Sequence, residues 1–165
     1  MNYRDTLAYH AAMNVTVTTA QPGEFQEITD LWEASVRATH HFISEDDIGF
    51  FKPLVRDTYL AAVELRCARN GAGDILGFVG VAEAKIEMLF VSPTHFGQGI
   101  GTRLLRQAID SLGATLVDVN EQNPQGIGFY EHHGFERIGR SPLDGTGRPY
   151  PLLHMRLRSG AETPA

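Results

Sequence analysis

Apolar residues recur at helical spacing in two long segments of the chain. The first begins at Glu24 and ends near His40 or His41, and the second follows a glycine-rich loop and ends at Gly113. Spacings of three and four residues place side chains on one face of a helix, and glycine commonly follows a helix end. The pattern predicts two amphipathic helices. Their apolar positions are Phe25, Ile28, Trp32 and Val36 in the first and Ile100, Leu104, Leu105, Ala108, Ile109 and Leu112 in the second.

Two shorter helices are predicted from local signals. Ser44, with Asp47 three residues later, is typical of a helix start, and acidic residues there complement the helix dipole. Pro53 lies inside the segment that follows, so this helix should be short or broken. A second short helix is predicted over residues 125–133.

Strand-like runs occupy much of the remaining chain. The segment 85–91 is mostly apolar, which favours a central strand, and a helix separates it from the next strand. Such a strand–helix–strand crossover joins parallel strands. The order of elements therefore predicts one mixed α/β domain over residues 14–158, with a flexible extension at 1–13 and a loose tail at 159–165. The predicted strands are 15–18, 59–69, 75–82, 85–91, 115–120, 135–140 and 150–157.

Composition and charge narrow the possible partners. Twenty acidic and fourteen basic residues give a formal net charge of −6, without a basic block, so we expect neither nucleic acid nor a membrane surface as partner. Cys67 is the only cysteine, which excludes an internal disulfide and fits a reducing compartment. No signal peptide or spanning segment is visible, which predicts a cytoplasmic location.

The stretch "LFVSPTHFGQGIGTRLL", residues 89–105, joins a strand to a helix through three glycines. Free amides at a helix start bind anions, and glycines let a ligand approach the backbone. Two nucleotide-binding motifs fail on spacing, because Lys-Ser/Thr does not follow Gly101 and no third glycine stands at position 102 or 104. A tight turn that merely feeds a core helix is the alternative.

Two sequence tracts resemble the motifs of the GCN5-related N-acetyltransferase (GNAT) family. "FVSPTHFGQGIGTRLL" is similar to motif A, with Gly99 and Gly101 at its two glycines but Phe96 where Arg or Gln is usual. "NPQGIGFYEHHGF" is similar to motif B, which Asn123, Tyr130, Gly134 and Phe135 match, whereas Gly126 replaces the usual Ala. The tracts "VNEQN", "GRPYPLLHM" and "ATHHFIS" resemble the bacterial YjaB-like branch, and the resemblance spans residues 15–157.

The resemblance implies a fold and a donor. The fold would be a mostly antiparallel sheet with a parallel splayed strand pair, flanked by about four helices. The donor would be acetyl-CoA, with its pyrophosphate on the loop amides and its pantetheine arm along the central strand. Asn123 would fix the cofactor arm or the loop, or instead only cap the next helix. The implied cofactor-binding residues are Leu89, Phe90, Val91, Phe96, Gly97, Gln98, Gly99, Ile100, Gly101, Thr102, Asn123 and Tyr130.

The resemblance also implies catalytic roles. Tyr130 would protonate the leaving thiolate, unless it only packs its helix, and a backbone N–H of Leu89 or Val91 would bind the oxyanion. Glu87 would act as a base through water and contact the substrate, or instead be a solvated strand residue. His40 and His41 would border the acceptor, or instead lie at the surface.

Several residues carry no assigned chemistry. Cys67 is interpreted as a buried structural thiol. Adjacent histidines point in different directions on a helix, so neither the pair at 40–41 nor the pair at 132–133 predicts a metal site. His154 should face opposite to its strand neighbours, toward the cleft or solvent.

The expected function is therefore transfer of an acetyl group to a primary amine of a small molecule or a protein. The alternatives are an acyl-CoA-binding sensor or regulatory domain without turnover, and a phosphate-binding module unrelated to CoA. Tyr130 matches the family motif, which argues against the sensor. Phe96 and Gly126 depart from the family motifs, which favours keeping the sensor as an alternative. A homodimer is possible, but no stripe in the sequence marks its interface.

Overall fold

A single seven-stranded sheet organises the chain in a computed structural model that describes residues 14–160. The strand order is β1-β2-β3-β4-β5-β7-β6, and every neighbouring pair is antiparallel except β4 with β5. The prediction of a mostly antiparallel mixed sheet with one parallel pair is confirmed. The strands are β1 (Thr16–Thr19), β2 (Glu64–Arg69), β3 (Ile75–Ala82), β4 (Lys85–Val91), β5 (Leu116–Asn120), β6 (Phe135–Ser141) and β7 (Leu152–Leu157).

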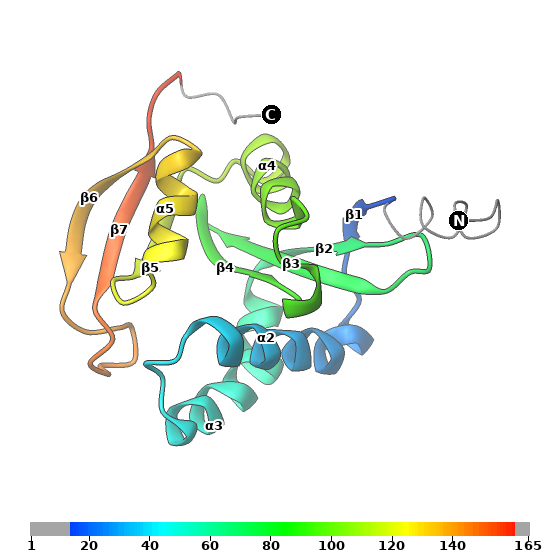
Figure 1. Cartoon of the computed structure of the whole chain (residues 1–165), viewed down its shortest axis with the longest axis horizontal. Helices are drawn as coiled ribbons and strands as arrows, with labels where there is room; N and C mark the ends of the chain where they lie inside the picture. Colours follow the sequence, from blue (N-terminus) through cyan, green and yellow to red (C-terminus); the bar gives the residue numbers. More distant parts are fainter. Residues whose placement is uncertain (1–13, 161–165) are drawn as a thin grey trace.

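Within residues 14–160, four α-helices cover the two faces of the sheet, α2 and α3 on one and α4 and α5 on the other (Figure 1). Ser44 caps α3, as predicted, and accepts a hydrogen bond from the Asp47 N–H at 3.1 Å. Gly113, at φ +69°, ends α4. The helices are α2 (Phe25–Thr39), α3 (Glu45–Leu54), α4 (Ile100–Leu112) and α5 (Pro124–His132), with short helical turns at η1 (Pro22–Glu24), η2 (Val55–Tyr59), η3 (Leu60–Ala62) and η4 (Pro93–His95).

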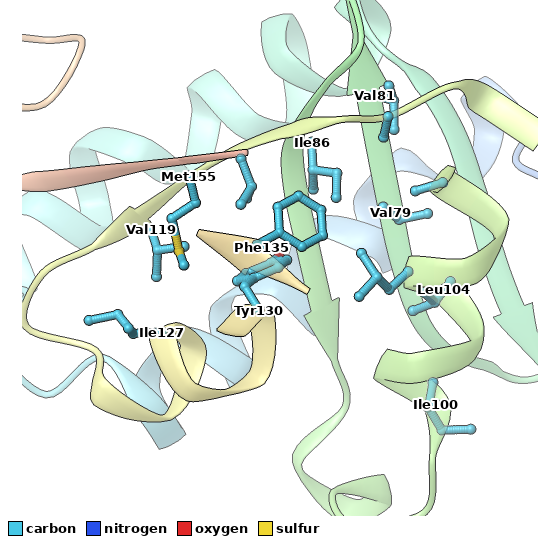
Figure 2. Packing of buried hydrophobic residues seen from close by; sticks show 14 of the residues in the cluster. Val79, Val81, Ile86, Ile100, Leu104, Val119, Ile127, Tyr130, Phe135 and Met155 are labelled. Atoms are coloured by element: carbon cyan, nitrogen blue, oxygen red, sulfur yellow. The ribbon is translucent and has the colours of Figure 1, made fainter. Parts of the chain in front are cut away.

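Two hydrophobic clusters fill the space between the sheet and its helices. The cluster under α2 and α3 holds Trp32 and the fully buried Phe78 and Cys67, and burial raises the pKa of the Cys67 thiol to about 11. The interpretation of Cys67 as a buried structural thiol is confirmed. The cluster under α4 and α5 includes Tyr130 beside Phe135 (Figure 2).

The parallel pair of β4 and β5 diverges soon after it begins. The two strands pair only at Lys85 with Leu116 and at Ile86 with Val117, whereas β5 pairs with β7 along its whole length. In Figure 1, β5 turns with β6 and β7 away from β4. The later part of β4 therefore has a β-strand on one edge only.

One predicted strand begins too early. The segment 59–69 was expected to be extended throughout, but residues 55–62 continue α3 as helical turns, and β2 begins at Glu64. Leu60 is buried among the residues under α2 and α3, so burial favours the helical turn. A short apolar run fits a buried strand and a buried helix equally well.

The extension at 1–13 and most of the predicted tail lie outside the described residues. Among residues 14–160, no helix combines the length and apolar character that crossing a bilayer requires.

Candidate active site

A cleft of about 460 Å³ opens where β4 and β5 diverge. Its walls come from β4, the following loop, the first turn of α4, β5, α5 and the end of α2. The sequence predictions converge here, since most of the predicted site residues line this one cleft. Those residues are His40, Glu87, Leu89, Phe90, Val91, Phe96, Gly97, Gly99, Ile100, Gly101, Thr102, Asn123 and Tyr130.

The open edge of β4 presents backbone groups to the cleft. The Ser92 N–H donates to the Leu76 carbonyl at 2.8 Å, which continues the β3–β4 register and marks a hydrogen-bonded pair. Such pairs alternate in an antiparallel ladder, so Phe90 also bonds to β3. Leu89 and Val91 therefore direct their N–H and C=O groups away from β3, toward the gap with β5.

The start of α4 offers further amides. The first intrahelical bond runs from the Arg103 N–H to the Gly99 carbonyl at 3.1 Å, so the amides of residues 100–102 precede the helical ladder. Gly97 and Gly99 have φ of +74° and +80°, which L side chains rarely adopt. These glycines thus shape the turn that exposes the amides at the positive end of the helix dipole.

Tyr130 lies on α5 at the inner wall of the cleft. Its side chain is 8% exposed and packs edge-to-face on Phe129 and Phe135, with ring centroids 5.1 and 5.5 Å away. Burial raises the pKa of Tyr130 well above its ordinary value. The phenol therefore keeps its proton at neutral pH and is available as a donor.

His40 follows the last residue of α2 and lines the other end of the cleft. Burial, with a smaller contribution from nearby His41, lowers the pKa of His40 to about 4. The Thr39 hydroxyl donates to the Ser35 carbonyl at 2.7 Å and also lies 2.7 Å from the His40 Nδ1. Since that hydroxyl hydrogen is already used, Nδ1 must donate, which leaves the Nε2 lone pair free.

The depressed pKa of His40 predicts an unusual titration. The folded state favours the neutral ring, so the contribution of His40 to stability is complete above the ordinary value of about 6.5 and is lost as pH falls toward 4. An NMR titration should give a midpoint near 4 for the ring signal that the His40→Asn variant lacks. Unfolding of that variant in urea should also depend less on pH in this window. A midpoint near 6.5 would contradict the burial of the ring.

A network of polar side chains borders the cleft beside Glu87. The Asp118 carboxylate accepts from Lys85 Nζ at 2.8 Å and from His154 Nδ1 at 2.7 Å, and His154 Nε2 lies 2.7 Å from Ser141 Oγ. Burial alone would raise the pKa of Asp118, but hydrogen bonds from His154 and Lys85 hold it below its ordinary value. Of the three linked residues Asp118, His154 and Ser141, only Asp118 lines the cleft. The network therefore keeps a carboxylate ionised there.

Comparison with known proteins assigns the family. The model of the acetyltransferase (GNAT) domain matches residues 56–137. The peptidyl-lysine N-acetyltransferase YjaB of Salmonella typhimurium strain LT2 is 34% identical over 143 residues, which are 87% of this chain and 98% of YjaB. The solution structure of apo YjaB from Escherichia coli has a TM-score of 0.80 at 34% identity and covers 87% of this chain and 97% of that one. This chain belongs to the GNAT family.

Resemblance at the level of fold extends to distant GNAT structures. The PaiA N-acetyltransferase of Thermoplasma acidophilum, solved in complex with coenzyme A, has a TM-score of 0.66 at 18% identity and covers 88% of this chain and 99% of that one. The predicted family and its YjaB-like branch are confirmed. The protein is an acetyl-CoA-dependent N-acyltransferase of the GNAT family.

The departures of this GNAT protein from the family motifs have structural counterparts. The Asn123 Oδ1 caps α5 by accepting from the Gly126 N–H at 3.1 Å. A Cβ at Gly126 would lie 2.5 Å from the Asn123 Nδ2, so glycine leaves room for this capping side chain. The alternative role of Asn123 as a cap is thus confirmed, although the residue also lines the cleft.

Three predicted site residues of this GNAT chain lie at or beyond the rim of the cleft. Phe96 lines the mouth with a side chain that is 43% exposed. Gln98 lies outside the lining, with its Nε2 3.5 Å from the Thr94 carbonyl, and His41 is exposed and outside it too. The side chains of these two residues therefore lie outside the cleft, and for Gln98 only the predicted role of its backbone amide stays a prediction.

Sequence reasoning missed other cleft residues. Ser35 and Asp118 line the cleft outside every quoted tract, whereas Thr39 and Phe129 line it from within quoted tracts that assigned them no role. Asp118 stands between two buried valines of β5, and this alternation was the one available signal. Among the described residues, no group of three or more His, Cys, Asp or Glu side chains could hold a metal ion.

Proposed function

We propose that this enzyme transfers the acetyl group of acetyl-CoA directly to the side-chain amine of a protein lysine, within a ternary complex. The observation that carries the proposal is the open edge of β4, which leads to the free amides at the start of α4 within one cleft. An extended, amide-rich ligand can add to such an edge as an extra strand, and an anion can bind such amides. Acetyl-CoA combines both chemistries.

The donor would span the cleft. Its pantetheine arm would pair with Leu89 and Val91, and its pyrophosphate would accept from the amides of residues 97–102. Backbone donors make a lysine in the loop unnecessary. The coenzyme A complex of the structurally similar PaiA protein supports the choice of donor.

The reaction would need three groups around the thioester. The neutral amine attacks the carbonyl carbon, and the N–H of Leu89 or Val91 stabilises the oxyanion. As the C–S bond breaks, the Tyr130 hydroxyl donates its proton to the departing sulfur, and solvent later returns a proton to Tyr130. The nitrogen loses its extra proton to a base.

Two residues can serve as that base. The Nε2 of His40 carries a free lone pair, and the ring stays neutral far below neutral pH. Glu87 lies on β4, is more exposed, and has Lys85 Nζ 3.8 Å from its carboxylate. A base must reach the attacking nitrogen directly or through one water, and both residues line the cleft.

The charge around the cleft favours a cationic acceptor. Glu87 and Asp118 contribute two carboxylates against the single ammonium of Lys85. A lysine side chain arrives as a cation, because its pKa is about 10.4, and must lose a proton before it attacks. The relative YjaB, a peptidyl-lysine N-acetyltransferase, supports this acceptor class.

The test combines binding with turnover. Calorimetry should show acetyl-CoA binding, and lysine-containing peptides should release CoA, whereas the same peptides with acetylated lysines should not. Mass spectrometry should find the acetyl group on the lysine nitrogen. Binding without turnover on any amine would favour the sensor or regulatory domain, and failure to bind acetyl-CoA would exclude both functions.

Replacing Phe96 by arginine should raise the affinity for acetyl-CoA. The ring lies at the mouth of the cleft and offers no hydrogen-bond donor where the family usually has Arg or Gln. The Phe96→Arg variant should bind acetyl-CoA about tenfold more tightly, since one charge-assisted hydrogen bond is worth about 1.5 kcal/mol or more. Calorimetry of both proteins, with Phe50→Arg as a control at another exposed phenylalanine, checks this. Equal affinities of the wild type and Phe96→Arg would mean that Phe96 does not weaken acetyl-CoA binding.

A further inference from the structure

His133 is buried but incompletely hydrogen-bonded, at the point where α5 ends. It is 3% exposed, and the ring of Phe129 packs edge-to-face on it with centroids 4.8 Å apart. Within the described part of the chain, its Nδ1 is the one buried side-chain nitrogen or oxygen without a hydrogen-bond partner. Burying an unpaired polar atom costs stability, so packing alone does not explain a histidine here.

The other ring nitrogen of His133 contacts the cofactor end of the cleft. Nε2 lies 3.3 Å from the Thr102 Oγ1, and Thr102 is in the first turn of α4, among the amides that precede the helical ladder. Thr102 lines the cleft, whereas His133 does not. His133 therefore has two contacts with the lining of the cleft, its hydrogen bond to Thr102 and its packing on Phe129, and only the first involves a polar group.

The protonation state of His133 sets the direction of this hydrogen bond. Burial, with the nearby charges of His132 and Arg106, lowers the pKa of His133, so the ring is neutral and carries one N–H. If Nδ1 held the hydrogen, a buried donor would be unpaired, which is rarer in proteins than an unpaired acceptor. The hydrogen therefore belongs on Nε2, which donates to Thr102.

A hydroxyl that accepts from His133 is free to donate elsewhere. Its own hydrogen then points away from the ring, and Thr102 shares the first turn of α4 with the amides of residues 100–102, which precede the helical ladder. Three amide donors and one hydroxyl donor would then surround the same point. That arrangement suits a phosphate oxygen, which accepts several hydrogen bonds at once.

We propose that His133 is a positioning residue for the pyrophosphate of the acyl donor, because it fixes the Thr102 hydroxyl as a donor to a phosphate oxygen. The inference rests on the proposed function, which places the pyrophosphate at the start of α4. His133 is not one of the matched motif positions, and an apolar side chain of similar size would leave no unpaired nitrogen in this packed site. The proposed role accounts for a buried nitrogen that packing alone does not explain.

Steady-state kinetics and calorimetry on four variants test this role. His133→Leu and Thr102→Val should each raise the KM and Kd for acetyl-CoA about tenfold, the effect of one charge-assisted hydrogen bond, with little change in kcat. The double variant should be no worse than Thr102→Val alone, because both changes remove the same bond. His133→Gln should keep the affinity, since its amide can place an N–H near the Nε2 position. The melting temperature of His133→Leu should equal or exceed that of the wild type.

A truncated donor separates positioning from a general structural role. S-acetylpantetheine retains the thioester and the arm but lacks the pyrophosphate, so its KM should be the same for wild type and for His133→Leu. Equal loss with both donors would overturn the inference, as would an unchanged affinity for acetyl-CoA in either variant or additive losses in the double variant.

Two further comparisons keep the outcome decisive. If His133→Leu does not fold, His133→Gln against His133→Asn carries the test, because asparagine places its N–H near Nδ1 and should lose the affinity that glutamine keeps. Equal affinities for these two would refute the role. If the wild type itself fails to bind acetyl-CoA, the proposed function fails, whereas binding that is insensitive to these variants refutes only His133.

Discussion

Replacing Tyr130 by phenylalanine should lower kcat for acetyl transfer by about 10²-fold or more, the contribution usual for a positioned general acid. The departing thiolate would have to take its proton from water. The ring would still pack on Phe129 and Phe135, so folding and the KM for acetyl-CoA should change little. Measuring kcat and both KM values, together with the melting temperature, checks the expectation.

The control for Tyr130→Phe is the same substitution at Tyr59, a half-buried tyrosine on η2 outside the cleft. Tyr59→Phe should retain full activity. A Tyr130→Phe enzyme with wild-type kcat on its true acceptor would exclude the phenol as the acid. Tyr130 would then be a packing residue of α5, as the simpler interpretation of its sequence position has it.

Placing a carboxylate at Gly101 should weaken acetyl-CoA binding by about 100-fold. Gly101 lies in the first turn of α4 and lines the cleft. A Cβ there would meet the Phe129 ring at 3.6 Å, an ordinary contact, so the fold should tolerate a side chain. Helix starts attract anions, so the carboxylate of Gly101→Glu would compete for the amides at the start of α4. Its negative charge would also repel the pyrophosphate that should bind there.

The matched control is Gly101→Gln, which has nearly the same shape without the charge. Calorimetry should find a much smaller loss for the glutamine variant, and the difference between the two should shrink at high salt. Equal losses would show that the site is sensitive to bulk alone. In that case the amides of α4 would not be the anion site.

The elements with a strong local pattern could be predicted closely. The strand 75–82 and the strand 85–91 have the predicted bounds, because apolar runs between turn residues leave little freedom. The helix that Gly113 ends also has the predicted end. The segment 59–63 could not be predicted, since its helical turns depend on the burial of Leu60 against elements distant in sequence.

The cleft could be predicted from the sequence motifs that line it. The polar network beside the cleft could not be predicted. Asp118 acquires its partners through strand pairing, with His154 directly opposite on β7 and Lys85 on β4. Such register depends on the whole sheet, and 36 residues separate Asp118 from His154. The role proposed for His133 could not be predicted from the sequence either, because its contact with Thr102 forms only where α4 and the end of α5 meet.

The burial of Cys67 has a practical consequence for the chemistry of this enzyme. Acetyl transfer releases CoA as a free thiol, and the protein's own thiol is inaccessible and has a pKa of about 11. A colourless disulfide reagent that reports free thiols should therefore count turnover without a background from the native enzyme. Slow labelling of Cys67 would instead report the rate at which the sheet opens, so this thiol can be used to follow unfolding of the native protein.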